Sequence, residues 1–120
     1  MDLTITIPLE PRTKKNSQRI IKTGDHYRII PSKAYVEYED KCKKYVPAYH
    51  IDNRVNIKAL YYMGSHRKVD LNNLHEALCD VLTKHGCLED DNSEIIAAMD
   101  GSRVLYDKEN PRTEVTITTI

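Results

Sequence analysis

The sequence contains neither phenylalanine nor tryptophan, and all of its aromatic residues are tyrosines, eight in number. A tyrosine hydroxyl needs a hydrogen-bond partner when it is buried, so these aromatic side chains are expected to be half-buried. Long apolar runs are also missing, because the longest cover five residues, at 59–63 and 95–99. A helix that crosses a bilayer needs about 20 apolar residues. The sequence therefore predicts no membrane segment.

Cysteines are few, and their spacing fits no common site. Cys42, Cys79 and Cys87 are odd in number and form no C-x-x-C motif. A disulfide framework or a zinc site is therefore not expected, and a reducing cytoplasm is the default location. The first residues also lack the basic start and apolar run of a signal peptide, which agrees with a cytoplasmic location.

The net charge of the whole sequence is zero, but its two halves carry opposite charges. Residues 1–68 hold 14 Lys and Arg against 7 Asp and Glu, whereas residues 69–120 hold 4 against 11. This split suggests a basic region beside an acidic cluster, which suits a polyanionic substrate and a divalent cation. The alternative is that the charges are solvated on unrelated faces.

The pattern of apolar residues, glycines and prolines predicts the order β-β-β-α-β-α-β-β. The strands are expected over 3–9, 19–22, 26–30, 54–63, 94–99 with a continuation over 102–106, and 114–120, and the helices over 33–46 and 72–85. This order is typical of an α+β fold, in which two helices pack on one mainly antiparallel mixed sheet. The length of 120 residues fits a single domain.

Acidic residues surround the second predicted helix. Its apolar face directs Asn72, Asn73, Glu76 and Asp80 away from the core. Asp70 lies at the start of this helix, and an acidic loop with Asp90 and Asp91 follows its end. We expect these carboxylates to converge, which requires either that the loop folds back along the helix or that the neighbouring strand brings Asp70 across.

Carboxylates that gather in one place repel each other and need a cation. Oxygen ligands without cysteine or paired histidine favour Mg²⁺ or Mn²⁺, which can polarise a phosphodiester and activate water. Arg67 and Lys68 lie directly before the acids and could bind the substrate phosphates. Other roles stay open: Asp70 could cap the helix, Asn73 and Glu76 match a capping box, and 90–92 could be a polar turn.

The stretch over about 66–95 also has the order of a known pattern. It contains Asp70-Leu71-Asn72-Asn73-Leu74, then Asp80-Val81-Leu82-Thr83-Lys84, Gly86 and the pair Asp90-Asp91. This arrangement resembles the RusA family of Holliday-junction resolvases, whose pattern is D-x-D-N-L, a helix with D-x-L, a glycine and a D-D pair. The flanks agree more loosely, with a first strand that ends near Pro8 and a basic loop at 14–16.

The resemblance implies an α+β homodimer, found in phages, prophages and bacteria, that uses Mg²⁺ or Mn²⁺ to cut four-way DNA junctions by paired, symmetric nicks. By position it makes Asp70, residue 72 and Asp91 metal ligands, Asp90 a supporting acid and residue 76 a catalytic lysine. A twofold dimer suits a junction, because symmetry presents two identical sites to two opposed strands.

Two of these positions depart from the family pattern. Asn72 stands in place of an acid, and Glu76 stands in place of the lysine. Since residues 72 and 76 are one helical turn apart on the same face, the carboxylate of Glu76 could restore the charge lost at Asn72. We therefore predict Asp70, Asn72, Glu76 and Asp91 as metal ligands, and Asp70, Glu76, Asp90 and Asp91 as the catalytic set.

Basic residues of the first half are the candidates for DNA contact. They are Lys14, Lys15, Arg19, Arg67 and Lys68. Such phosphate contacts position a duplex without reading its sequence, and they predict affinity that falls with salt. Two other functions remain open: a junction-binding protein that has lost the chemistry, which Asn72 and Glu76 favour, and a non-enzymatic assembly protein whose acidic loop binds Ca²⁺ or a basic partner.

Overall fold

The computed structural model describes residues 2–14 and 18–120, and the side chains of Gln18 and Arg19 lie outside that description. Its main sheet has five strands. In chain order they are β1 (Asp2–Ile7), β4 (Val55–Met63), β5 (Ile96–Ala98), β6 (Arg103–Tyr106) and β7 (Arg112–Thr119). Strand β7 lies between β1 and β4 and is antiparallel to both. Strands β5 and β6 follow each other along the opposite edge of β4 and are parallel to it.

Strands β5 and β6 are separated by a short turn, so the predicted strand over 94–99 is shortened to three residues. The register of β5 against β4 shifts between Val55 and Asn56. The side chain of Asn56 then holds the backbone of Asp100, with Oδ1 accepting from the N–H at 2.8 Å and Nδ2 donating to the carbonyl at 3.2 Å. Gly101 follows with a φ of 84°, in the region that favours glycine. These contacts bend the chain between the two strands.

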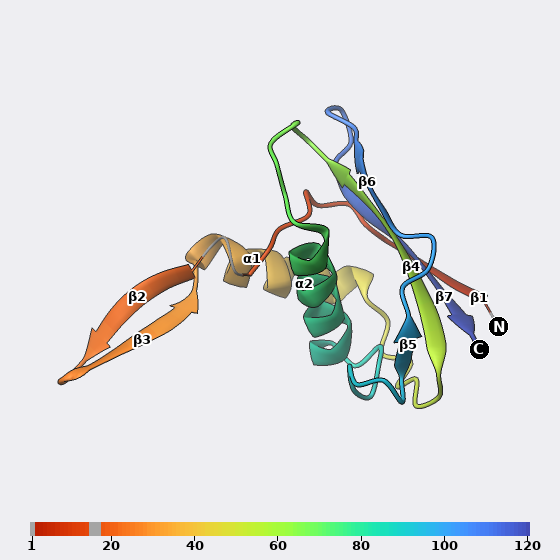
Figure 1. Ribbon diagram of the computed structural model, residues 1–120, viewed down its shortest axis with the longest axis horizontal. Coiled ribbons are helices and arrows are strands. Elements are labelled where there is room, and N and C mark those ends of the chain that lie inside the picture. The colour runs from red at the N-terminus through yellow and green to blue at the C-terminus, as the bar shows by residue number, and fades with distance from the viewer. Residues whose placement is uncertain (1, 15–17) are drawn as a thin grey trace.

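Two helices, α1 (Lys33–Cys42) and α2 (Leu71–Lys84), cover one face of the sheet (Figure 1). Alternate residues of the strands point toward them, as the period of a half-buried strand requires. The core side chains from the sheet are Ile5, Ile7, Val55, Ile57, Ala59, Tyr61, Met63, Val115 and Ile117. Those from the helices are Tyr35, Tyr38, Cys42, Leu74, Ala77, Leu78, Val81 and Leu82. The predicted architecture, two helices on one mixed sheet, is confirmed.

The first helix is shorter than predicted. Ser32 caps it, because its Oγ accepts a hydrogen bond from the N–H of Tyr35 at 3.1 Å. The α-helix ends at Cys42 rather than at residue 46, and a 3₁₀ turn, η2 (Lys43–Tyr45), continues it. The helical segment as a whole stops at Tyr45, because the residue before a proline disfavours the helical conformation, and Val46 is extended. No helix among the described residues is long and apolar enough to cross a membrane.

The predicted hairpin is present, but it stands apart from the main sheet. Strands β2 (Gln18–Thr23) and β3 (His26–Pro31) pair with each other and with no other strand in the described part of the chain. In Figure 1 they form an arm that projects from the start of α1, on the side away from the sheet. The sequence showed a hairpin here, whereas its separation from the sheet is a finding of the structure.

Candidate functional site

Helix α2 begins at Asp70, which is its N-cap. One carboxylate oxygen of Asp70 accepts a hydrogen bond from the N–H of Asn72 at 2.9 Å. This satisfies a donor that the first turn of the helix leaves open, and a negative charge at this end of a helix is favourable. The capping role that the sequence left open for Asp70 is therefore real. The capping box at Asn73 and Glu76 is not, because Asn73 lies inside the first turn.

The face of α2 that points away from the sheet carries Asn72, Glu76 and Asp80. The first two are exposed, as expected from the helical period. Asp80, in contrast, is half-buried. Its Oδ2 lies 3.4 Å from the Nζ of Lys14. The ion pair joins a basic residue of the N-terminal loop to the acidic face of the helix. The two oppositely charged halves of the sequence therefore meet at this helix.

The flank of α2 nearer the sheet holds His75. Its Nδ1 lies 2.7 Å from the hydroxyl of Tyr61, a residue of β4 that is almost fully buried. Partial burial lowers the pKa of His75, because the charged form loses solvation. The hydrogen bond gives the buried Tyr61 hydroxyl a partner and ties the central strand to the helix that carries the candidate site.

At its other end, α2 stops in a Schellman motif. The N–H of Cys87 donates to the carbonyl of Leu82 at 2.9 Å, and the N–H of Gly86 donates to that of Thr83 at 3.1 Å. Gly86 has a φ of 81°, which a glycine adopts without strain. The chain thereby reverses direction after the helix, as the sequence predicted from Gly86.

Backbone hydrogen bonds then fix both ends of the acidic loop. The N–H of Ile51 donates to Cys87, and the N–H of Glu89 donates back to Ile51, both at 2.9 Å. On the far side, the N–H of Val55 donates to the carbonyl of Ile95 at 2.8 Å. The segment 90–94 is therefore held between two anchored points, even though its own side chains are exposed.

The charge of Asp91 acts on a side chain of α2. The pKa of the Cys79 thiol is raised to about 12. Burial is the main cause, and the negative charges of Asp91 and Asp80 add to it. In the loop itself, an oxygen of Asp90 accepts a hydrogen bond from the N–H of Asp91 at 2.7 Å. Asp91 and Asp80 therefore both act electrostatically on Cys79 of α2.

The convergence of the carboxylates that the sequence predicted is not found among the described residues, which contain no preformed metal cluster. No three side chains among their Asp, Glu, His and Cys lie together in a way that could hold an ion. Asp70 and Asp80 occupy opposite parts of the helix, ten residues or about 15 Å apart. An Mg²⁺ ion, however, is usually held by one or two carboxylates together with substrate phosphates and water, rather than by a cage of side chains. The donor types at Asp70, Glu76 and Asp91 fit such an ion.

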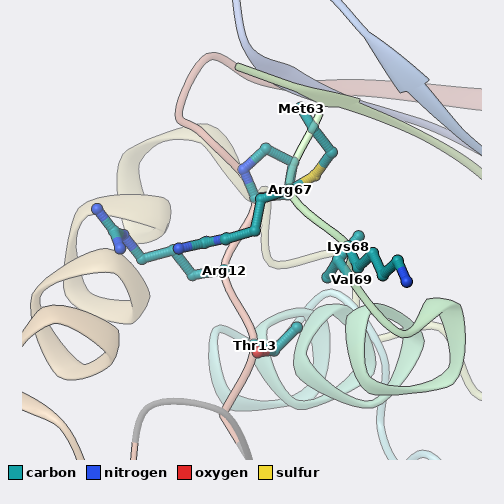
Figure 2. A pocket seen from close by; sticks show the side chains of 7 residues that line it. Arg12, Thr13, Met63, Arg67, Lys68 and Val69 are labelled. Carbon is teal, nitrogen blue, oxygen red and sulfur yellow. The ribbon is translucent and has the colours of Figure 1, made fainter. Parts of the chain in front are cut away.

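A basic pocket of about 210 Å³ lies just before α2. Figure 2 shows it between the N-terminal loop and the segment that leads from β4 to the helix. Its walls are Pro11, Arg12, Thr13, Met63, Arg67, Lys68 and Val69. The side chains of Arg12 and Arg67 extend to the same side in Figure 2, whereas Lys68 extends to the other. The guanidinium groups are suited to a bidentate hold on a phosphate.

Arg12 is a residue that the sequence analysis did not select. It opens the basic loop that holds Lys14, so its position in a run of cations was the available signal. What the sequence could not provide was the packing of this loop against the segment after β4, which brings Arg12 beside Arg67. Among the other predicted DNA contacts, Lys15 and the side chain of Arg19 lie outside the described residues.

Comparison with known proteins agrees with this arrangement. A family model described as Endodeoxyribonuclease RusA matches residues 8–118, nearly the whole chain. No curated protein compared with the sequence matches it. The match includes the basic pocket, the whole of α2 and the acidic loop.

Proposed function

Since the chain belongs to the RusA endodeoxyribonuclease family, we propose that it binds four-way DNA junctions and nicks them symmetrically in the presence of Mg²⁺ or Mn²⁺. We also propose that it acts as a homodimer, because two opposed strands of a junction require two equivalent sites. The reaction is hydrolysis of a phosphodiester during recombination, repair or phage genome processing.

The proposal rests on the closeness of the basic pocket to Asp70, the first acid of helix α2. Lys68 and Val69 line the pocket, and Asp70 follows them directly. A DNA phosphate held by Lys68, which extends over the first turn of α2 in Figure 2, would lie close to the N-terminus of that helix, where backbone N–H groups and the helix dipole also favour an anion. This is the place at which a carboxylate and a phosphate can share a cation.

The candidate metal ligands are Asp70, Asn72, Glu76 and Asp91. Because no three of the described carboxylates lie together, one or two of them would hold the ion together with a DNA phosphate. When bound, Mg²⁺ or Mn²⁺ would polarise the phosphodiester and lower the pKa of a water molecule. Asp90 would orient the Asp91 segment through its hydrogen bond to the Asp91 N–H. Glu76, exposed one turn after Asn72, would supply the negative charge that the asparagine lacks.

The cations have a separate task in this proposal. Arg12, Arg67 and Lys68 would bind phosphates and offset the negative charge that develops during hydrolysis. They would also take over the electrostatic part of the lysine that the family pattern has at position 76. Lys14, paired with Asp80, would hold the N-terminal loop against α2.

Asp70→Asn is the sharpest test, because asparagine caps a helix about as well as aspartate. The substitution keeps the cap and removes the charge. Labelled four-way junctions should be nicked symmetrically by the natural chain with Mg²⁺ or Mn²⁺ but not with EDTA. The variant should lose at least about a hundredfold in rate while its thermal stability stays the same. Equal cleavage by the variant would contradict the proposed role of Asp70.

One observation favours a second function. Because the described acids form no three-residue metal cluster, and Asn72 and Glu76 depart from the family pattern, the chain could serve as a junction-binding protein without cleavage. Salt-sensitive binding of the junction, with no nicking in Mg²⁺, Mn²⁺ or Ca²⁺, would select this function. Cleavage by the natural chain would exclude it.

A further inference from the structure

The hairpin of β2 and β3 has one bare apolar face. The register places Ile20 opposite Ile29 and Lys22 opposite Tyr27, and directly opposed residues share a face of the ribbon. Ile20 is 70% exposed, Tyr27 70% and Ile29 66%. The ammonium of Lys22 lies 5.8 Å from the centre of the Tyr27 ring. Two-stranded hairpins are marginally stable alone, so such a face calls for a partner.

The charge of the segment indicates which partner. Residues 12–33 contain seven Lys and Arg but a single acid, Asp25 at the tip of the hairpin. The arm is also continuous with the basic pocket, because the loop that begins at Arg12 leads into β2. The acidic half of a second copy of the chain also carries the opposite charge, and the sedimentation measurement below distinguishes that occupant. DNA, however, offers a phosphate at every nucleotide along the length of the arm.

The shape of the arm agrees with DNA as well. A strand of six residues extends about 20 Å, which is the length of about six base pairs. The major groove of B-DNA admits a two-stranded ribbon, and apolar side chains there contact thymine methyl groups. Charged side chains at the margins of a ribbon can reach the phosphates of the groove walls.

We propose that the β2–β3 arm lies in the major groove of a duplex arm next to the cleavage site. Its apolar face, Ile20, Tyr27 and Ile29, contacts the base edges, and Lys22 and Arg28 contact the phosphates. This inference rests on the proposed function, since it takes branched DNA as the ligand. It adds a second point of contact, remote from the pocket and the acids, that holds one duplex arm in a fixed direction.

The test measures binding without cleavage, by fluorescence anisotropy of a labelled four-way junction in EDTA. The variant Ile20→Thr/Ile29→Thr keeps a high β propensity while it removes the apolar contact. It should weaken binding about tenfold and leave the salt dependence unchanged. Lys22→Gln/Arg28→Gln should instead flatten the slope of log affinity against log salt by about two. Val104→Thr, an exposed β-branched residue on β6, is the matched control and should bind as the natural chain does.

The outcomes separate this inference from the proposed function. If the natural chain binds the junction but never cuts it, the nuclease proposal fails and the arm can still be tested by these variants. If the natural chain cuts and both hairpin variants bind normally, the arm inference alone is wrong. Sedimentation of the Ile20→Thr/Ile29→Thr variant then shows which partner covers the apolar face of the hairpin. A change of oligomeric state would identify that partner as a second copy of the chain and overturn the proposed DNA contact.

Discussion

The two ends of helix α2 differ in charge and in what holds them in place. At its start, Asp70 adjoins a pocket lined by Arg12, Arg67 and Lys68, which belong to loops and reach the site through long side chains. At its end, the acidic loop is fixed by backbone hydrogen bonds on both sides. A basic end built of long side chains suits the capture of phosphates, whereas an acidic loop anchored on both sides suits chemistry that needs exact placement. Binding and cleavage should therefore be separable by mutation.

Among the substitutions that separate the two ends, the largest effect is expected in the acidic loop, and it should be comparable to that of Asp70→Asn. Asp91→Asn should reduce junction cleavage by about a hundredfold, because it removes a carboxylate proposed to hold the metal. Affinity for the junction should not fall, since the change also removes a charge that repels DNA. Gel-based cleavage and anisotropy, run side by side, measure the two effects. Asp2→Asn, an exposed acid on strand β1, is the control. A parallel loss of binding in Asp91→Asn would show that the two ends of α2 do not divide binding from cleavage.

At the basic end, substitutions should weaken junction binding more than cleavage. Arg12→Gln/Arg67→Gln should weaken junction binding about thirtyfold, from roughly 1 kcal/mol for each charge-assisted phosphate contact. The salt slope should decrease in magnitude by about two. Cleavage at saturating enzyme should change only severalfold. A titration of affinity against salt concentration tests this, and an unchanged slope would remove the pocket from the DNA interface.

Glu76 lies between the two ends and should show an intermediate effect. Glu76→Gln should raise the Mg²⁺ concentration needed for half-maximal cleavage about tenfold. Asn72→Asp, added to that variant, should reverse the change, because it returns one negative charge to the same face of α2. Metal titrations of the two variants measure this. Failure of the second substitution to rescue the first would show that Glu76 does not substitute for the missing acid.

The anchoring of the acidic end can be weakened directly. Gly86→Ala places a side chain at a φ of 81°, with its Cβ 3.3 Å from the His50 Cε1. It should lower the free energy of unfolding by about 1 kcal/mol and the melting temperature by about 4 °C. Gly86→Asn should be milder, because asparagine tolerates this conformation. Junction affinity should persist in both, and calorimetry with anisotropy distinguishes the two effects.

The smallest expected effect reports the proximity of Asp91 to α2 in solution. In Asp91→Asn, the pKa of Cys79 should fall below about 12, because a nearby negative charge is gone while burial remains. Alkylation of Cys79 by iodoacetamide at pH 8 should become roughly twofold faster. Cys42, whose pKa is raised by burial without Asp91, is an internal control. Equal rates for Cys79 in both proteins would place Asp91 away from the helix.

Much of the fold could be predicted because it is local in the sequence. Alternation in β4 and helical spacing in α2 each determined an element and its buried face, and Gly86 marked the end of α2. The change from α-helix to a 3₁₀ turn at Lys43 was missed, because the helical spacing of apolar residues continues to Tyr45 through both forms. The short β5 depended on contacts of Asn56 with Asp100, 44 residues away, which no local pattern shows.

The candidate site was less predictable, because its parts come from distant segments. Spacing on one helix placed Asn72 and Glu76 correctly on the exposed face. The ion pair of Lys14 with Asp80 and the addition of Arg12 to the pocket both depend on how the N-terminal loop packs, which is a tertiary property. The double role of Asp70, as a cap and as a proposed ligand, cannot be resolved from residue type, since both roles use the same carboxylate.

The contact of Tyr61 with His75 has a consequence for the direction in which α2 points its side chains. Turning the helix by one residue would swing His75 through about 100° and break the bond to the Tyr61 hydroxyl. The central strand therefore sets the rotational position of the helix, and with it the outward aim of Glu76. A phenylalanine at position 61 would fill the same space in the core without fixing that angle, which gives a chemical reason for the tyrosine at this position.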